Sequence, residues 1–314
     1  MTNTATRVIE IPYIITLVAQ ATYLHNFATR IMQHLPLISA FDLQQLLKQQ
    51  NNILIIDCRF DLANTEAGAQ QYAQSHIPGA FFLDLDKDLC APKTGHNGRH
   101  PLPERETLAK RLRAIGMNND THVIVYDQAD SMFAAHMWWL LLWLGHQQVQ
   151  VLDGGLTAWT KAGGELTAEN PSTPHQGNFA AQNTLTPTVD AQYLLRNLGT
   201  PSVYIVDARA QPRYKGEVEP MDPVAGHIPG AVNRPFMDNL QPDGTYKPAN
   251  MLKEEWTAFL KNHDPQTVVH QCGSGVSACH NLLAMAQAGF AITTIYPGSW
   301  SEWCANPDYP TAKG

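Results

Sequence analysis

The sequence is poor in charged residues and has no excess of basic ones. Asp, Glu, Lys and Arg make up 16% of its 314 residues, whereas about 25% is typical of globular proteins. Acidic residues outnumber basic ones by 28 to 21, which gives a formal net charge of -7 at pH 7. A nucleic-acid-binding surface needs a basic excess, so we expect no nucleic-acid partner.

Long apolar runs are absent as well. A membrane-spanning helix needs roughly 18 or more consecutive apolar residues, and no such run occurs, so we expect no membrane partner. Residues 1–34 contain a modest apolar stretch that no clear small-residue cleavage site follows. This pattern favours an N-terminal extension, or an upstream start with Met32 as the true first residue, over a secretory signal.

Cysteine is scarce, and its pattern excludes two kinds of site. The five cysteines are odd in number, and no two of them form a Cys-x-x-Cys pair. An odd number fits no closed disulfide framework, and the missing pair argues against a zinc site. We expect no metal and no cofactor, and a reducing, cytoplasmic location in which one or more thiols are chemically active.

An internal duplication is the most informative feature that is present. Four landmarks occur twice, in the same order and at nearly constant spacing, which is the signature of a repeated unit. They are Ile55–Arg59 with Ile205–Arg209, His76–Ala80 with His227–Ala231, Val123–Asp127 with Val268–Cys272, and Gly154 and Trp159 with Gly298 and Trp303. We therefore predict two copies of one domain, residues 35–163 and 187–307, joined by a Gly- and Pro-containing linker, residues 164–186.

In each copy, short apolar runs of strand length alternate with longer helical patterns. The expected strands are 53–56, 122–126, 149–152, 203–207, 267–271 and 292–295. The expected helices are 104–115, 132–144, 189–198 (capped by Thr188), 249–262 and 278–288. Buried strands between helices indicate an α/β fold, in which each copy has a parallel sheet with helices on both faces. Ligands of such sheets bind beyond the carboxyl ends of the strands.

A cysteine stands at one of these strand ends. Cys272 directly follows a predicted strand and opens a loop that contains Gly273 and Gly275 before a helix begins. The glycines allow the backbone N–H groups to turn inward, and such a nest at a helix N-terminus attracts negative charge. We expect this to favour the thiolate, the nucleophilic form of cysteine. The residues predicted to bind the anionic substrate around Cys272 are Gly273, Gly275, Val276 and Ser277.

A thiolate in this place also serves phosphate ester hydrolysis. That chemistry needs an arginine further along the loop to clamp the phosphate, and the residue at that position is Ala278. The sequence therefore argues against a phosphatase. Cys279, inside the predicted helix, is expected to be a core residue.

Several segments together resemble a known family, the two-domain rhodanese-type sulfurtransferases. They are residues 76–80 and 227–231 (His-Ile-Pro-Gly-Ala), 153–159, 298–303 and the loop 272–278. The likeness covers residues 35–307, and the loop is most similar to that of the 3-mercaptopyruvate sulfurtransferases. It implies two rhodanese-like domains, a persulfide on Cys272, and transfer of its sulfur to cyanide or to a thiol acceptor such as thioredoxin.

The resemblance also implies roles for other residues. Arg213 matches the arginine that holds the substrate anion, although a loop salt bridge is the alternative. His76 matches a catalytic histidine near Ser274, although His227 in the second copy suggests a histidine that only fixes its own loop. Asp127 occupies the place of Cys272 in the first copy, so that domain is expected to be catalytically silent.

Two alternatives to the 3-mercaptopyruvate enzyme stay open. Met221 stands where the family usually carries a second substrate arginine, which leaves room for a thiosulfate:cyanide sulfurtransferase, a rhodanese in the strict sense. Loss of the cysteine would mark a non-catalytic rhodanese-like binding module, and Cys272 is present. The sequence therefore favours an enzyme that takes sulfur from 3-mercaptopyruvate.

Overall fold

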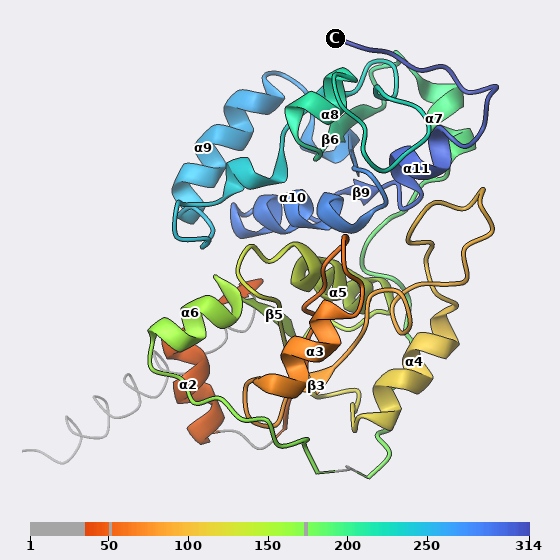
Figure 1. Ribbon diagram of the computed structural model, residues 1–314. Helices are drawn as coiled ribbons and strands as arrows, with labels where there is room; N and C mark the ends of the chain where they lie inside the picture. Colours follow the sequence, from red (N-terminus) through yellow and green to blue (C-terminus); the bar gives the residue numbers. More distant parts are fainter. Residues whose placement is uncertain (1–34, 50–51, 173–174) are drawn as a thin grey trace, which may run out of the picture. The chain divides into compact units, whose positions relative to one another are not determined.

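The computed structural model describes residues 35–49, 52–172 and 175–314. The predicted extension, residues 1–34, lies outside the described residues. Residues 36–314 form one compact unit, in which two halves follow each other along the chain (Figure 1).

The first half contains a parallel sheet of five strands. In chain order its elements are β1 (Leu37–Ile38), α2 (Ala40–Gln49), β2 (Ile53–Asp57), α3 (Ala67–Gln74), β3 (Phe81–Phe82), α4 (Arg105–Ala114), β4 (His122–Tyr126), α5 (Met132–Trp143), β5 (Val149–Leu152) and α6 (Gly155–Lys161). The strands lie in the order β1-β5-β4-β2-β3, and every neighbouring pair is parallel.

The second half repeats this arrangement with a sheet of four strands. Its elements are α7 (Ala191–Asn197), β6 (Tyr204–Asp207), α8 (Gln211–Lys215), β7 (Val232–Asn233), the 3-10 helix η1 (Phe236–Asn239), α9 (Ala249–Leu260), the 3-10 helix η2 (Pro265–Thr267), β8 (Val268–Gln271), α10 (Val276–Gln287), β9 (Thr294–Ile295) and α11 (Ser299–Trp303). The order β7-β6-β8-β9 matches β3-β2-β4-β5, again with parallel pairs only. The predicted α/β fold with two related parallel sheets is confirmed.

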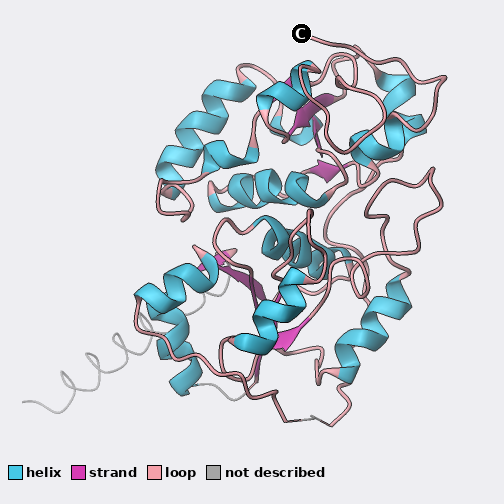
Figure 2. Cartoon of the chain, in the orientation of Figure 1, coloured by secondary structure: helices cyan, strands magenta, loops and turns pink. Residues whose placement is uncertain are grey.

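Helices cover both faces of each sheet (Figure 2). Along β4, Ile124 packs with residues of α2 and α6, whereas its neighbours Val123 and Val125 pack with α4 and α5. Along β8, Val269 packs with α7 and α11, and Val268 packs with α9 and α10. A strand covered on both faces favours apolar residues, and β4 is apolar from Val123 to Tyr126. In β8 the apolar residues Val268 and Val269 are followed by the buried His270 and Gln271.

The two halves share one hydrophobic core, which is built around α5 and α10. The two helices pack against each other, and Figure 1 shows them side by side at the centre of the molecule. Their side chains are buried on nearly every face, and residues of both belong to one continuous apolar cluster. α5 is apolar apart from His136, so it cannot face water, and α10 covers it with a helix whose side chains are buried from Ala278 to Met285.

The longer predicted elements agree with the structure to within two or three residues at their ends. The cap of α7 differs, because the Asp190 carboxylate, and not Thr188, accepts the N–H of Tyr193 at 2.7 Å. Thr188 instead forms a parallel bridge with Ile295. The sequence does not predict α2, although it has ten residues. It also does not predict the short elements, in which two to eight residues carry too little periodicity: α3, α6, α8, α11, β1, β3, β7, η1 and η2.

The domain boundaries predicted from the duplication stay a prediction. Within the linker, residues 164–186, the chain follows the first half, where Phe179 N–H donates to Met117 O at 3.1 Å and Gln182 N–H donates to Leu144 O at 2.8 Å.

Among the described residues, no helix is long and apolar enough to cross a membrane.

Buried histidines make the stability of this fold depend on pH. Burial lowers the pKa of His136, His270 and His280 to about 3, whereas an unfolded histidine titrates near about 6.5. Between these values the unfolded chain binds more protons than the folded one, so acidification lowers the free energy of unfolding. Between pH 7 and 5, each such histidine contributes about 2 kcal/mol of this loss.

We predict that His270→Gln makes the loss of unfolding free energy between pH 7 and 5 smaller by about 2 kcal/mol. Urea unfolding at both pH values measures the difference, and His263→Gln, at an exposed histidine, serves as the control. An equal loss in wild type and His270→Gln would contradict this assignment.

Candidate active site

The cysteine loop lies at the carboxyl edge of the second sheet, directly after its central strand β8. Cys272 is 1% exposed, and α10 begins four residues later. This is the edge at which parallel α/β sheets bind their ligands.

The start of α11 holds the loop in place. Cys272 N–H donates to Ser299 Oγ at 3.1 Å, and Ser299 Oγ donates to Tyr296 O at 2.9 Å. The carbonyl groups of Cys272 and Gly273 accept the N–H groups of Trp300 and Ser301, at 3.0 and 2.9 Å. Ser299 has a φ of 53°, which is unfavourable for a residue other than glycine. Its two hydrogen bonds explain why the backbone keeps this conformation.

Gly275 turns the chain so that its N–H group points at the thiol. That N–H donates to Cys272 Sγ at 3.2 Å. Gly275 has a φ of 85°, and a Cβ there would lie 2.4 Å from Pro297 O, so both the conformation and the space require glycine. The first N–H groups of α10, from Val276 onward, have no partner within the helix, and they make this end of the loop favourable for negative charge.

The equivalent place in the first half holds a carboxylate in a nest of the same kind. Asp127 directly follows β4 and is 1% exposed. It accepts the N–H groups of Ser131, Phe133 and Ala134 at 3.0, 2.9 and 3.2 Å. A carboxylate therefore satisfies the N-terminus of α5, at the position that corresponds to Cys272.

A histidine from the first half contacts the loop serine. His100 Nδ1 lies 2.7 Å from Ser274 Oγ, and His100 Nε2 lies 3.7 Å from Asp86 Oδ1. Burial lowers the pKa of His100 to about 4, against the opposite effect of Asp86. The imidazole is therefore neutral near pH 7 and has one ring nitrogen that donates and one that accepts.

His76, the histidine expected at Ser274, lies in another environment. Its Nδ1 is 2.7 Å from Tyr72 O, its Nε2 is 3.1 Å from Glu169 O, and its ring stacks on that of Tyr72 at 3.9 Å. His227 makes the same stack on Tyr214, also at 3.9 Å. The histidine at the loop is thus His100, and His76 performs in the first half the local packing that His227 performs in the second.

Two arginines lie over Gly273. Arg213 Nη2 pairs with Glu219 Oε1 at 2.7 Å and with Asp222 Oδ2 at 3.2 Å. The Arg99 side chain, from the first half, forms an ion pair with the other oxygen of Asp222. The backbone N–H of Arg99 donates to Ser301 Oγ at 3.0 Å. A Cβ on Gly273 would lie 2.7 Å from Arg99 Nη2 and 3.4 Å from Arg213 Nη1. The loop itself holds no cation, but two guanidinium groups stand beside it.

The remaining four thiols lie outside the position that opens the loop. Burial raises the pKa of Cys58 and Cys279, and it raises that of Cys90 to about 12 and of Cys304 to about 11. Cys279 Sγ donates to Gly275 O at 3.2 Å inside the core, as expected for a packing residue. These four cysteines are thiols, not thiolates, near neutral pH.

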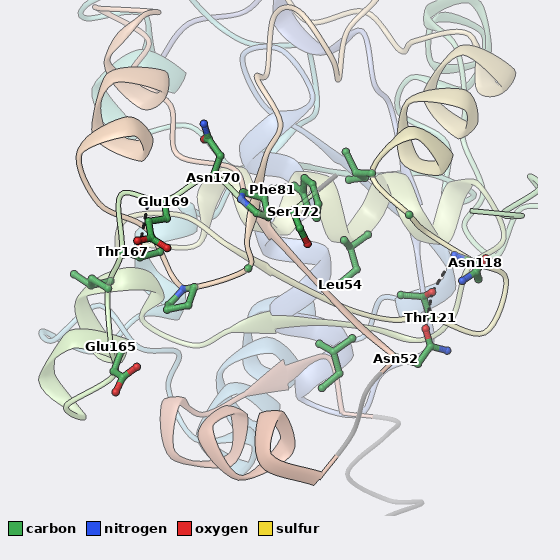
Figure 3. A pocket seen from close by; sticks show the side chains of 17 residues that line it. Asn52, Leu54, Phe81, Asn118, Thr121, Glu165, Thr167, Glu169, Asn170 and Ser172 are labelled. Carbon is green, nitrogen blue, oxygen red and sulfur yellow. Dashed lines mark hydrogen bonds between the residues drawn. The ribbon is translucent and has the colours of Figure 1, made fainter. Parts of the chain in front are cut away.

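A cavity of about 880 Å³ lies at the opposite edge of the first sheet. Figure 3 shows its labelled lining side chains, among them Asn52 before β2 and Thr121 before β4. This is the amino edge of the strands, and none of the residues predicted to be catalytic lines the cavity. The cavity is therefore separate from the cysteine loop.

Comparison with known proteins identifies the family. The rhodanese-like domain matches residues 39–162 and again residues 190–306. The chain belongs to the rhodanese family. A probable 3-mercaptopyruvate sulfurtransferase of Pseudomonas aeruginosa is 46% identical over 90% of this chain and 100% of that protein. A putative thiosulfate sulfurtransferase of Mycobacterium tuberculosis, SseB, is 37% identical over 88% of this chain and 97% of that protein.

Solved structures agree with this assignment. The 3-mercaptopyruvate sulfurtransferase SseA of Escherichia coli shares 31% identity over 84% of this chain and 98% of that one, with a TM-score of 0.73. The enzyme of Leishmania major has a TM-score of 0.74 at 27% identity, over 86% of this chain and 75% of that one. This rhodanese is accordingly a sulfurtransferase, as the resemblance in the sequence implied.

Arg99 and His100 are the residues that the sequence reasoning missed in this rhodanese. They are adjacent basic residues in a Gly- and Pro-rich stretch of the first copy, and no such pair occurs at the equivalent place in the second copy. That departure from the repeat was the available signal, because a loop that differs between two copies is free to serve a function of its own.

The geometry of the loop makes Gly275 sensitive to substitution. Gly275→Ala should lower the free energy of unfolding by about 2 kcal/mol more than Gly289→Ala. Gly289 also has a φ near +80°, but nothing lies within 4 Å of a Cβ placed there. Both variants therefore bear the same backbone strain, and only Gly275→Ala meets Pro297 O. Equal losses in urea unfolding would show that the loop is not packed as described.

Proposed function

We propose that this rhodanese takes sulfur from 3-mercaptopyruvate onto Cys272 and passes it to a thiol acceptor. The contact of His100 with Ser274, at 2.7 Å, is the observation that favours 3-mercaptopyruvate as the donor. Cys272 acts as the nucleophile, Ser274 and His100 move a proton, and Arg213 binds the carboxylate of the donor. Gly273, Gly275, Val276 and Ser277 line the loop and supply backbone N–H groups.

The first step forms a persulfide. The Cys272 thiolate attacks the sulfur of 3-mercaptopyruvate, so that a new S–S bond forms and the C–S bond of the donor breaks. The electron pair of that bond passes to the carbon, which becomes the enolate of pyruvate. The persulfide anion lies beside the Gly275 N–H and the start of α10, where backbone donors stabilise charge without titrating.

A proton must move in this step. The thiol of 3-mercaptopyruvate loses its proton, and the enolate carbon of the product gains one, so the net reaction needs no outside acid. A neutral histidine paired with a hydroxyl can accept the first proton and return it. His100 is neutral near pH 7 because burial lowers its pKa to about 4. Asp86 Oδ1, at 3.7 Å from Nε2, is too far for a hydrogen bond and acts on the imidazole through its charge.

Thiosulfate is the second candidate donor, and the two arginines beside Gly273 favour it. Thiosulfate carries two negative charges and leaves as sulfite after the same attack, and no proton has to move. Arg99 and Arg213 provide the positive charge that the loop residues lack. The Ser274 and His100 pair would have no task in that reaction, and for this reason we favour 3-mercaptopyruvate.

The second step returns the enzyme to its starting state. The thiolate of an acceptor such as thioredoxin attacks the outer sulfur, and Cys272 leaves as a thiolate. We further propose that the first domain is catalytically silent, since a carboxylate such as Asp127 cannot take up sulfane sulfur. A cytoplasmic location suits a protein whose five cysteines are all free.

Cys272 is predicted to carry the sulfur. Treatment with 3-mercaptopyruvate in the absence of an acceptor should raise the intact mass by one sulfur atom, and Cys272→Ser should abolish both this adduct and turnover. Cys90→Ser, at a half-buried thiol, should keep both. Turnover retained by Cys272→Ser would refute the mechanism.

His100→Gln should separate the two donors. The kcat/KM for 3-mercaptopyruvate is expected to fall at least about 100-fold, the lower end of what proton transfer contributes. The kcat/KM for thiosulfate should change little, because no proton moves. His76→Gln is the matched control, and it should leave the ratio of the two values as in wild type. Equal losses with both donors in His100→Gln would count against proton transfer by this residue.

A further inference from the structure

We propose that the second half holds one buried water molecule, bound by the side chains of Asp207 and Gln271 and by the backbone N–H of Ile228. The water takes the place that the hydroxyl of Tyr126 takes in the first half. Gln271 is the last residue of β8 and directly precedes Cys272, so the site lies at the strand end that carries the nucleophile. It does not depend on which sulfur donor is used.

In the first half, the Tyr126 hydroxyl joins two buried polar groups. It donates to Asp57 Oδ2 at 2.7 Å, and it accepts the N–H of Ile77 at 3.3 Å. Tyr126 and Asp57 are register partners in the parallel pair of β4 and β2, so their side chains stand beside each other on one face of the sheet. All three residues are fully buried. The hydroxyl therefore satisfies a carboxylate oxygen and a backbone amide at once.

The surroundings of this carboxylate recur in the second half. The backbone N–H of Arg209 donates to Asp207 Oδ1 at 2.9 Å, and its Nη2 donates to Oδ2 at 2.6 Å. The same two bonds between Arg59 and Asp57 measure 2.9 and 2.7 Å. The two carboxylates are thus held by their arginines in the same way, and what differs is the register partner.

Gln271 is the register partner of Asp207 and stands where the first half has Tyr126. Its side chain is fully buried, and neither Nε2 nor Oε1 has a hydrogen-bond partner in the part of the chain that the structure describes. Ile228, the equivalent of Ile77, is fully buried too, and its N–H donates to no described residue. Buried polar groups without a partner are unfavourable, so these groups call for a ligand that joins them.

The unpaired groups face the same side of the sheet. Gln271 follows Val269 by two residues along β8, so both side chains stand on one face, and Val269 packs there in one apolar cluster with Ile228. Trp300 from α11 belongs to the same cluster. Its indole N–H donates to Val224 O at 2.9 Å, so Trp300 does not take over the role of the tyrosine hydroxyl.

Water has the chemistry that these groups require. It can donate to Asp207 Oδ2, accept the N–H of Ile228, and use its remaining hydrogen or lone pair for the amide of Gln271. Buried waters typically make about three hydrogen bonds of this kind. A cation is disfavoured, because Arg209 already neutralises the carboxylate and the N–H of Ile228 repels positive charge. Glutamine is also shorter than tyrosine, so a further atom is needed to reach the position of the hydroxyl.

A crystal structure of the full chain, at a resolution that shows buried waters, tests the proposal directly. The expected result is one ordered water within about 3.2 Å of Asp207 Oδ2, Ile228 N and an amide atom of Gln271. The first half of the same molecule is the control, since the Tyr126 hydroxyl should hold the equivalent place there. A direct hydrogen bond from the Ile228 N–H to a protein atom would overturn the proposal. So would the lack of a water at these groups while other buried waters are ordered.

Two reciprocal variants test whether water and hydroxyl replace each other. Gln271→Tyr should lose the water, because its own hydroxyl reaches Asp207, and Tyr126→Gln should gain a water at Asp57. Tyr126→Phe is the matched control: it removes the hydroxyl but keeps the ring, and it should gain no water. A water that persists unchanged in a folded Gln271→Tyr, or a Tyr126→Gln structure without a new water, would contradict the proposal. Should Gln271→Tyr fail to fold, the wild type and Tyr126→Gln still decide the question.

Discussion

The packing of α5 against α10 is the constraint on which the rest of this structure depends. Each helix begins at the carboxyl edge of its sheet, α5 after Asp127 and α10 after the cysteine loop. α5 is apolar apart from His136 and cannot face water, and α10 is buried against it, so the two halves share one core. Across this core, residues from one half contact the loops of the other, as His100 contacts Ser274.

Each half contacts the other through one of its loops. Arg99, in the first half, donates its N–H to Ser301, and in the second half Tyr246 donates its N–H to Asp153 at 2.8 Å. These two contacts are similar in the two halves, but the residues at the two helix starts differ. In the first half a carboxylate accepts the N–H groups at the helix start, and in the second half a thiol stands there. At equivalent positions, therefore, Asp127 occupies the nest of the first half with its own side-chain oxygens, and Cys272 places a thiol in the nest of the second half.

The sequence predicted those parts of the fold and site that depend on local pattern or on the duplication. The central strands begin as short apolar runs between turn residues, and the cysteine loop has its glycines next to its nucleophile, so both could be recognised directly. Contacts across the core could not. The family resemblance implies that His76 lies at Ser274, but His76 packs on a tyrosine of its own half, as His227 does in the same motif of the second half. His100 and Arg99 reach the loop only because α5 and α10 bring the halves together, and no sequence period encodes that contact.

The central claim is that one thiol, Cys272, takes one sulfur from 3-mercaptopyruvate before any acceptor arrives. A single rapid mixing of the enzyme with an excess of 3-mercaptopyruvate, without acceptor, tests it most directly. The account predicts a burst of one pyruvate per chain, formed as the persulfide forms on Cys272. Absence of the burst, or a burst retained by Cys272→Ser, would contradict it.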